Sequence, residues 1–252
     1  TNPIPLPTTF SVYPNLRIEG GNGAFNQRIT QNTIPITVNK DMWIDWGGTF
    51  SAARDINIKG RLQVGRGGGA RGLFEIYDDQ AVTVDVDGDL ELLDNTGDPR
   101  FLVRNTNTNS LEHTVRVGGD LLIERGQFDL FNGNGTDNNA RLIFDGTGDA
   151  TFSRTGGSLP QLFRIGVSKS NNRNDIVDLQ SDFDLSGPTD TADKPVFFIS
   201  GILKFNNSGL DITLSDDGDL DIPGTAGLQV TQGTTRVFGD DTGIILDGCI
   251  VI

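Results

Sequence analysis

A nine-residue frame, apolar-x-apolar-x-Gly-x-apolar-x-apolar, recurs along the chain and limits its fold more than any other feature of the sequence. The frame fits INIKGRLQV (56–64), VDVDGDLEL (84–92), VRVGGDLLI (115–123) and the last nine residues (244–252). Strict alternation on both sides of the glycine predicts two short strands, each with one buried face, that meet at a bend. The frame therefore indicates a repeating unit built from pairs of strands.

Three looser copies extend the repeat, one centred on Ser181 and two around Gly146 and Gly218. All the copies together are centred on positions 60, 88, 119, 146, 181, 218 and 248, so successive centres are 27 to 37 residues apart. A unit of this size cannot bury its apolar face alone, so the units must stack. Because no helical period separates the copies, the sequence predicts an all-β chain folded as a parallel β-helix, a solenoid of stacked coils of about 27–37 residues.

The first 35 residues differ from the rest because they hold five of the ten prolines. Proline removes donors from a strand ladder, so we expect a Pro/Gly-rich linker or N-terminal cap over residues 1–35 and the β-helix over residues 36–252. The last frame ends on an apolar strand without a polar cap, so we expect the β-helix to continue beyond the C-terminus or to pair there with another chain. Cys249, at an outward position of that frame, is then an exposed or interfacial thiol.

Stacking the frames in register puts side chains of opposite charge next to one another. The expected neighbours are Asp87 with Lys59, Asp89 with Arg61, and Asp85 with Arg116. Opposite charges on facing strand positions stabilise a sheet, whereas like charges in register destabilise it. A ladder of charges therefore accounts for the acidic stretch VDVDGDLEL without a metal ion.

A calcium loop is the alternative interpretation of the same stretch. An EF-type loop counted from Asp85 needs glycine at position 6 and glutamate at position 12, where this chain has Leu90 and Thr96. We therefore expect no cofactor, with a structural calcium ion as the alternative.

Charge and composition restrict the classes of partner. The formal net charge is −14, so nucleic acids and anionic membranes would repel the chain. No stretch approaches the roughly 20 consecutive apolar residues of a membrane helix, and one cysteine rules out an internal disulfide. The absence of an initiating Met suggests a processed or excised piece of a precursor. We expect neither nucleic-acid binding nor membrane insertion.

The segment MWIDWGG is the best candidate for a functional surface. Trp43 and Trp46 could stack on a sugar ring while Asp41 and Asp45 accept hydrogen bonds from it, so these four residues are candidate glycan contacts. In the alternative interpretation, one or both tryptophans plug the open end of the solenoid beneath the N-terminal segment.

Other chemistry finds little support in the sequence. His113 is the only histidine and lies near no nucleophile motif, so we expect a solvent-facing or loop position and no catalytic or metal-binding residues. Phenylalanines cluster near the frames, and we expect them to stack inside the coils rather than to form a binding strip. They are Phe74, Phe101, Phe128, Phe144, Phe152, Phe163, Phe183, Phe197 and Phe205.

Three stretches resemble a known family of repeats. These are VRVGGDLLIERGQFDL (115–130), FSRTGGSLPQLFRIGVSKSNN (152–172) and IVDLQSDFDLSG (176–187). They are similar to the repeats of very large surface proteins in gliding and related Gram-negative bacteria. The similarity is clearest from about residue 115 to residue 252. Proteins of that family include cell-surface adhesins and are generally exported by the type IX secretion route.

The resemblance implies an extracellular or cell-surface location and a role in cell adhesion and gliding motility. We therefore expect a non-enzymatic structural or adhesive β-helical segment of a large secreted protein. Its partners would be other segments of the same long chain, other surface or secretion proteins, or glycans. The alternative is a carbohydrate-binding or polysaccharide-cleaving β-helix, because that fold also hosts polysaccharide lyases and hydrolases.

Overall fold

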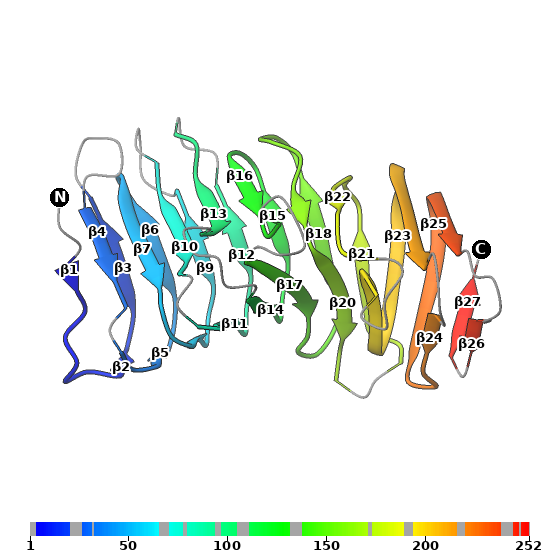
Figure 1. Cartoon of the computed structure of the whole chain (residues 1–252), viewed down its shortest axis with the longest axis horizontal. Coiled ribbons are helices and arrows are strands. Elements are labelled where there is room, and N and C mark those ends of the chain that lie inside the picture. The colour runs from blue at the N-terminus through cyan, green and yellow to red at the C-terminus, as the bar shows by residue number, and fades with distance from the viewer. Residues whose placement is uncertain are drawn as a thin grey trace.

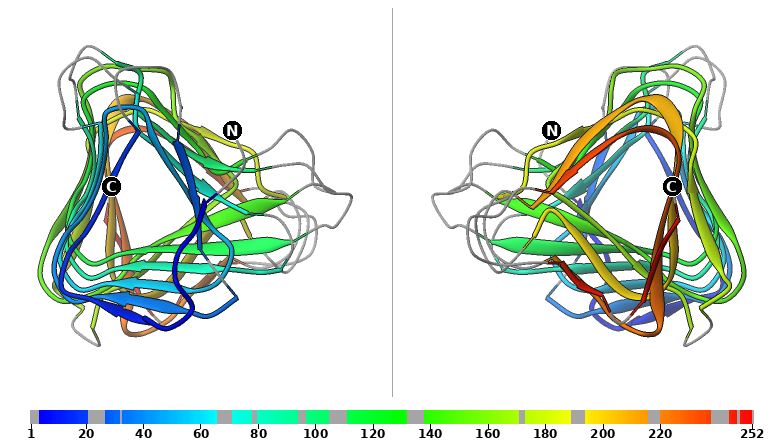
Figure 2. Two further views of the ribbon diagram at one scale, coloured as in Figure 1. Left: turned by 90° about the vertical axis from the view of Figure 1, so that its left-hand side faces the viewer. Right: turned by 90° about the vertical axis from the view of Figure 1, so that its right-hand side faces the viewer.

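Every strand pairing in the computed structural model is parallel. The structure describes residues 4–20, 27–31, 33–65, 71–77, 80–93, 97–104, 111–131, 138–170, 173–188, 194–215, 220–237, 244–246 and 248–251. These residues stack into a rod of triangular outline, with the two ends of the chain at opposite ends of the rod (Figures 1 and 2). They contain no helix, and so none that could cross a membrane. The predicted all-β parallel solenoid is confirmed.

Each regular coil contributes one strand to each of three faces, which we call faces A, B and C. Face A is an eight-stranded ladder. Its strands are β1 (Ile4–Pro5), β4 (Gln27–Thr30), β7 (Gly48–Ala52), β10 (Leu73–Ile76), β13 (Arg100–Val103), β16 (Gln127–Asp129), β19 (Gln161–Leu162) and β22 (Asp184–Leu185).

Faces B and C join through β23 (Val196–Ser215), which runs from one into the other. Face B also contains β2 (Val12–Tyr13), β5 (Ile36–Val38), β8 (Ile56–Ile58), β11 (Thr83–Val86), β14 (Glu112–Val117), β17 (Asn139–Phe144) and β20 (Arg164–Ser168). Face C also contains β3 (Leu16–Glu19), β6 (Met42–Asp45), β9 (Leu62–Val64), β12 (Leu90–Leu92), β15 (Leu121–Ile123), β18 (Ala150–Arg154), β21 (Ile176–Leu179), β25 (Ala226–Val237) and β27 (Cys249–Val251). A separate pair is formed by β24 (Leu220–Ile222) and β26 (Ile244–Leu246).

The coils are shorter than the spacing of the frames predicted. Register gives the coil length directly, and it runs from 20 residues (62 − 42, Met42 opposite Leu62) to 32 residues (161 − 129, Asp129 opposite Gln161). The predicted upper limit of 37 residues is wrong. The frame around Ser181 spans β21 on face C and β22 on face A, whereas the regular frames cross from face B to face C. The alternation of apolar and polar residues is the same at every corner of the triangle, so the sequence does not show which corner a frame occupies. The frames therefore predicted one coil too few between Gly146 and the end of the chain.

The core is a continuous apolar column inside the triangle. The rings of Phe50, Phe74, Phe101 and Phe128 follow one another along face A, with centroids 5.5, 4.7 and 5.3 Å apart. All four are at most 1% exposed, which confirms the predicted inward stack for this column. Phe197 is the exception to the prediction: it is half-buried and lies against the guanidinium of Arg164 at 5.2 Å.

The frame glycines are required by close approach between coils. A Cβ on Gly88 would lie 2.8 Å from the carbonyl oxygen of Gly60, and one on Gly119 would lie 2.3 Å from a carboxylate oxygen of Asp89. Gly60, Gly88 and Gly119 do not have left-handed φ values, although several other glycines do. The glycines therefore let neighbouring corners touch, which is a different reason from the bend that the sequence suggested.

Part of the segment expected to be a linker or cap contributes strands to the solenoid. β1, β3 and β4 lie within residues 1–35: β1 pairs with β4, and β3 pairs with β6 of the following coil. Leu16 and Ile18 of β3 join the apolar core with 8% and 4% exposure. The first described coil thus begins well before residue 36.

Candidate functional site

The MWIDWGG segment forms β6 and the turn that follows it on the outer side of face C. Met42 and Ile44 point into the core, so Trp43 between them points outward and does not plug the end of the solenoid. Its Nε1 donates to Oε1 of Gln63 at 2.7 Å, and Gln63 in turn donates to the carboxylate of Glu91. Trp43 is therefore half-buried and held by a polar chain across three coils.

Trp46 lies in the turn and is the one non-glycine residue with positive φ (50°) among the residues that the structure describes. Such a conformation is uncommon and concentrates at turns and functional sites. Its side chain is half-buried. Trp43 therefore lies on β6 and Trp46 in the turn after it, and both are half-buried.

The two aspartates of the segment already have partners in the protein. Asp41 accepts the backbone N–H of Arg61 at 3.0 Å, and Asp45, which is 1% exposed, accepts from Nε of Arg17 at 3.3 Å. Asp41 precedes β6 and Trp46 follows it, so a whole strand separates them. The tryptophans are therefore the better candidates for contact with a sugar, because Asp45 is buried and Asp41 already binds a backbone amide.

A column of Asn and Asp side chains runs along the corner between faces B and C. Each accepts a backbone N–H from the next coil through a side-chain oxygen, at 2.7–3.4 Å. The members of this corner column are Asn15, Asp41, Asp89, Asp120 and Asp149. The side chains continue the hydrogen-bond ladder where the backbone turns, which gives Asp89 of VDVDGDLEL a structural role.

The predicted charge neighbours have mixed outcomes. Lys59 and Asp87 form the expected ion pair at 3.0 Å. Asp85 lies opposite Arg116 in register, but the Arg116 guanidinium extends to Asp145 at 3.0 Å. Asp89 lies beside Arg61 in register, as expected, but each side chain has another partner: Arg61 lies 4.0 Å from Asp41, and Asp89 accepts the Asp120 amide. The Asp89 carboxylate binds a backbone amide instead of the Arg61 side chain.

The surroundings of Asp85 raise the pKa of its carboxyl group. Burial on face B raises the pKa of its carboxyl, and the carboxylates of Asp145 and Asp87 raise it further. Arg116 and Lys59 oppose these effects without cancelling them. Its environment therefore favours the neutral acid more than that of an ordinary surface aspartate.

A polar depression of about 570 Å³ opens at the corner between faces C and A. Asp98, Arg100, Glu124 and Arg125 contribute charged side chains to its lining, and Nε of Arg125 lies 3.6 Å from Asp98. Gly126 and Gly157, both with positive φ, form part of its wall. Cationic and anionic groups beside open backbone can hydrogen-bond to a hydroxyl-rich ligand.

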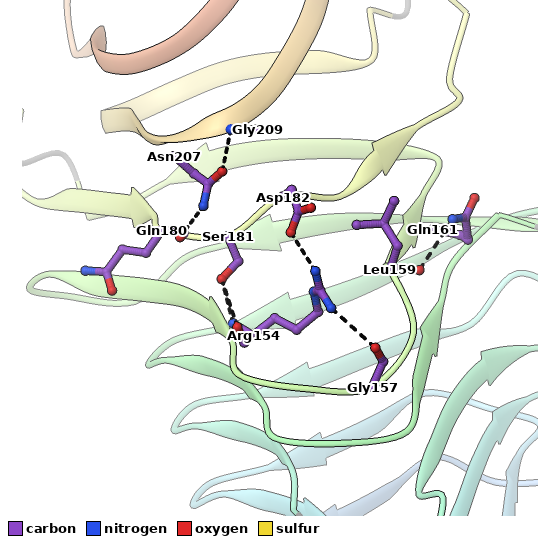
Figure 3. Close-up of polar contacts among 9 residues, drawn as sticks. All are labelled: Arg154, Gly157, Leu159, Gln161, Gln180, Ser181, Asp182, Asn207 and Gly209. Atoms are coloured by element: carbon purple, nitrogen blue, oxygen red, sulfur yellow. Dashed lines mark hydrogen bonds and ion pairs between the residues drawn. The ribbon is translucent and has the colours of Figure 1, made fainter.

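Arg154 joins the same corner to the following coil (Figure 3). Its Nη1 donates to the carbonyl of Gly157 at 3.3 Å and its Nη2 to Asp182 at 2.7 Å, while its backbone N–H donates to Ser181 at 2.7 Å. The frames did not predict this corner, because its residues come from three coils. The signal available was the spacing: Gly126 and Gly157 each follow the end of a face C strand by three residues (126 − 123 and 157 − 154).

The burial of two polar residues was not predicted from the sequence. His113 is 0% exposed and accepts the Val82 N–H at Nδ1 (3.1 Å), so the expectation of a solvent-facing or loop histidine is wrong. Lys169, also 0% exposed, donates to the carbonyl of Gly118 at 2.8 Å. Both continue the inward alternation, His113 before Val115 and Lys169 after Val167, and this periodicity could have identified them. Burial lowers the pKa of Lys169, and nearby aspartates oppose the shift.

Two expectations have no structural outcome. The side chain of Cys249 lies outside the described residues. Within the part of the chain that the structure describes, no three His, Cys, Asp or Glu side chains come together as metal ligands.

No protein-family model, curated protein or solved structure matches this chain.

Proposed function

We propose that the chain is a structural and adhesive β-solenoid segment of a large cell-surface protein, without catalytic activity. The observation that carries the proposal is the use of the repeated carboxylates. Asp41, Asp89 and Asp120 each accept a backbone amide of the next coil, so the acidic residues of the frame serve the rod itself. A repeat whose carboxylates bind its own backbone is suited to building length and to presenting variable surfaces.

The resemblance of residues 115–252 to repeats of gliding bacteria supports the rest of the proposal. It favours export by the type IX route, an extracellular location, and contacts with other segments of the same long chain or with other surface proteins. The net charge of −14 is compatible with such a surface.

Two measurements on the purified chain test the proposal. We expect no turnover in a scan of glycan and polysaccharide substrates, and we expect the immobilised chain to retain cells or cell-surface material from a gliding bacterium. Turnover that a single carboxylate substitution abolishes would overturn the non-enzymatic assignment. Absence of any retention would remove the adhesive part and leave a spacer.

A carbohydrate-binding role is the second candidate, favoured by the outward tryptophans and by the polar corner depression. Sugars bind proteins through ring stacking and through dense hydrogen bonding, and the two surfaces offer one each. A glycan array read with the wild type, with Trp43→Ala plus Trp46→Ala, and with Arg125→Ala distinguishes them. Binding unaffected by all three substitutions would exclude both surfaces.

A further inference from the structure

Two successive turns form one wall of the polar depression at the corner between faces C and A. The first turn contains Gly126, and the second contains Thr155, Gly156, Gly157 and Ser158. Gly126 and Gly157 have φ values of 89° and 79°, a left-handed conformation that suits glycine. A Cβ on Gly157 would lie 2.5 Å from the carbonyl oxygen of Gly126, so the two turns touch. The glycines therefore line the depression with peptide groups instead of side chains.

Several hydrogen-bond donors of this wall have no acceptor among the residues that the structure describes. They are the N–H groups of Gly126, Gly156 and Gly157 and the hydroxyls of Thr155 and Ser158. Gly126 is a buried residue, and buried backbone N–H groups nearly always have an acceptor. Successive backbone N–H groups in turns of this kind form concavities that bind anions. The wall therefore offers donors to a group that enters the depression.

Charged side chains line the rest of the depression. Arg100 and Arg125 are cationic, and Asp98 and Glu124 are anionic. Arg125 lies 3.6 Å from Asp98, but the two side chains are 45% and 49% exposed, and exposed ion pairs contribute little to stability. An anionic ligand can therefore compete with the Asp98 carboxylate for the Arg125 guanidinium.

The balance of donors and acceptors selects the class of ligand. A sugar hydroxyl both donates and accepts, whereas a carboxylate or a sulfate ester only accepts. The lining combines the donors of the glycine wall with two guanidiniums, and its anionic acceptors in the described part of the chain are Asp98 and Glu124. An oxygen-rich anion matches this surplus of donors, and charge-assisted hydrogen bonds are roughly twice as strong as neutral ones.

We propose that this depression binds the anionic group of an acidic sugar, either a carboxylate or a sulfate ester. The N–H groups of Gly126, Gly156 and Gly157 hold the anionic oxygens, and Arg125 neutralises their charge. The volume of about 570 Å³ lies within the range of small-molecule sites. The proposal rests on the carbohydrate-binding candidate above and narrows its ligand from glycans in general to acidic ones.

Amide resonances of the whole isotope-labelled chain, followed during titration with small sugars at pH 7, test the proposal. The probes are methyl glucuronide, a sulfate ester of methyl glucoside, and neutral methyl glucoside. We expect the amide signals of Gly126, Gly156 and Gly157 to shift saturably with an acidic probe, with a dissociation constant about tenfold or more below that of the neutral probe. The tighter of the two acidic probes identifies the preferred anionic group.

The outcomes separate this proposal from the carbohydrate-binding candidate itself. Equal affinity for the neutral and acidic probes would overturn the preference for an anion and leave a general sugar site. Absence of shifts at the three glycines with every probe would overturn the proposal entirely. The glycan array described above then shows whether the carbohydrate-binding candidate survives at the tryptophans.

Matched variants test the competition between Asp98 and the ligand. Asp98→Asn removes the resident carboxylate and is expected to strengthen the binding of methyl glucuronide about threefold. Asp221→Asn removes one negative charge at an exposed position on β24, outside the depression, and should leave the affinity unchanged. Weaker binding by Asp98→Asn, or equal effects of the two substitutions, would contradict the proposed arrangement.

A second pair of variants tests the cationic side of the depression. Arg125→Gln is expected to weaken the binding of methyl glucuronide about fivefold, because the charge-assisted contact is lost. Arg173→Gln makes the same change at an exposed position between β20 and β21, on another corner of the rod, and should have no effect. Equal losses for the two variants would show general attraction to cationic residues instead of a site at this corner.

Discussion

The central coils and the last coils of the rod differ in how many faces carry a continuous ladder. Between residues 56 and 154, faces A, B and C are all paired from coil to coil. Among the described residues after 205, only face C continues without a break, through β23, β25 and β27, while β24 and β26 form their own pair. The last coils are therefore attached to the rod by one face instead of three.

The corners between faces B and C also differ between the two regions. In the central coils, Gly88 and Gly119 allow close contact between successive corners, and Asp89 caps the amide of Asp120. In β23 the same corner is turned by Gly201, which has a φ of 87°, within one continuous strand of 20 residues. The strict frame thus coincides with three paired faces, and two of these faces separate where the frame is lost.

Deleting core contacts in the two regions should break the comparison most strongly. Phe101→Ala, in the middle of the ring stack, is expected to lower the stability of the rod by about 3–5 kcal/mol. Ile222→Ala, on β24 and equally buried, should cost about 2–5 kcal/mol but only in the last coils, because coils couple to their neighbours. Urea unfolding checks this: tryptophan fluorescence reports the N-terminal coils through Trp43 and Trp46, and circular dichroism reports the whole chain. Equal shifts of both signals for Ile222→Ala would contradict the expected independence.

The close contact of central corners should be the next most sensitive feature. A Cβ at Gly118 would lie 2.2 Å from the carbonyl oxygen of Asp87, so Gly118→Ala is expected to cost about 2–4 kcal/mol. Gly148 has a φ of 80° and open space around it, so Gly148→Ala should cost only the strain of the left-handed conformation, about 1–2 kcal/mol. Thermal unfolding of the two variants provides the measurement. A larger loss at Gly148 would mean that φ, rather than contact between coils, determines the choice of glycine.

Removing a corner acceptor should have an intermediate effect. Asp89→Ala leaves the Asp120 N–H without its side-chain acceptor, and we expect a loss of about 1–3 kcal/mol. Asp89→Asn keeps an acceptor oxygen and should cost much less. Chemical denaturation distinguishes the two, and equal losses would show that charge, not the hydrogen bond, is what this position supplies.

The exposed ion pair should matter less. Asp87→Lys places two lysines side by side with Lys59, and we expect a loss of up to about 1 kcal/mol, because both side chains are more than 40% exposed. Screening should shrink the loss in 1 M salt. Melting temperatures at low and high salt test this, with Asp221→Lys, at an exposed position on β24, as the control. A loss that does not depend on salt would point to packing instead of charge.

The smallest expected effect depends on pH. The pKa of Asp85 is higher in the folded protein than in the unfolded chain, so ionisation of this group favours unfolding. The cost is absent well below the unfolded pKa of about 3.9 and grows as the pH rises through the folded pKa. Asp85→Asn should therefore raise the melting temperature slightly at pH 7 and not at pH 3. A stabilisation of the same size at both pH values would contradict the assignment.

Much of this architecture was predictable from the alternation of the sequence. The strands of the three best frames and the face B and face C registers follow from residues 56–64, 84–92 and 115–123 alone. Coil phase was not predictable beyond residue 150, because alternating strands on any face look alike. Lys169 also occupies an inward position although its side chain is cationic.

The candidate surfaces were predictable only in part. Trp43 and Trp46 share a strand and turn that can be read locally. The corner depression depends on which coils stack, so residues as distant as Asp98 and Gly157 come together only in three dimensions. An ion pair between Arg61 and Asp89 could not be judged from register, because register does not show which carboxylates cap backbone amides.

Segment-resolved hydrogen exchange of the unmodified chain tests the central claim most directly. Three paired faces should make the strands of residues 56–64, 84–92 and 115–123 exchange slowly and together. Residues 211–213 and 220–222, which pair with no strand on the side facing the central rod among the residues that the structure describes, should exchange faster, while the face C strand at 201–205 stays protected. Uniform protection from residue 56 to residue 251 would contradict the break in the ladder.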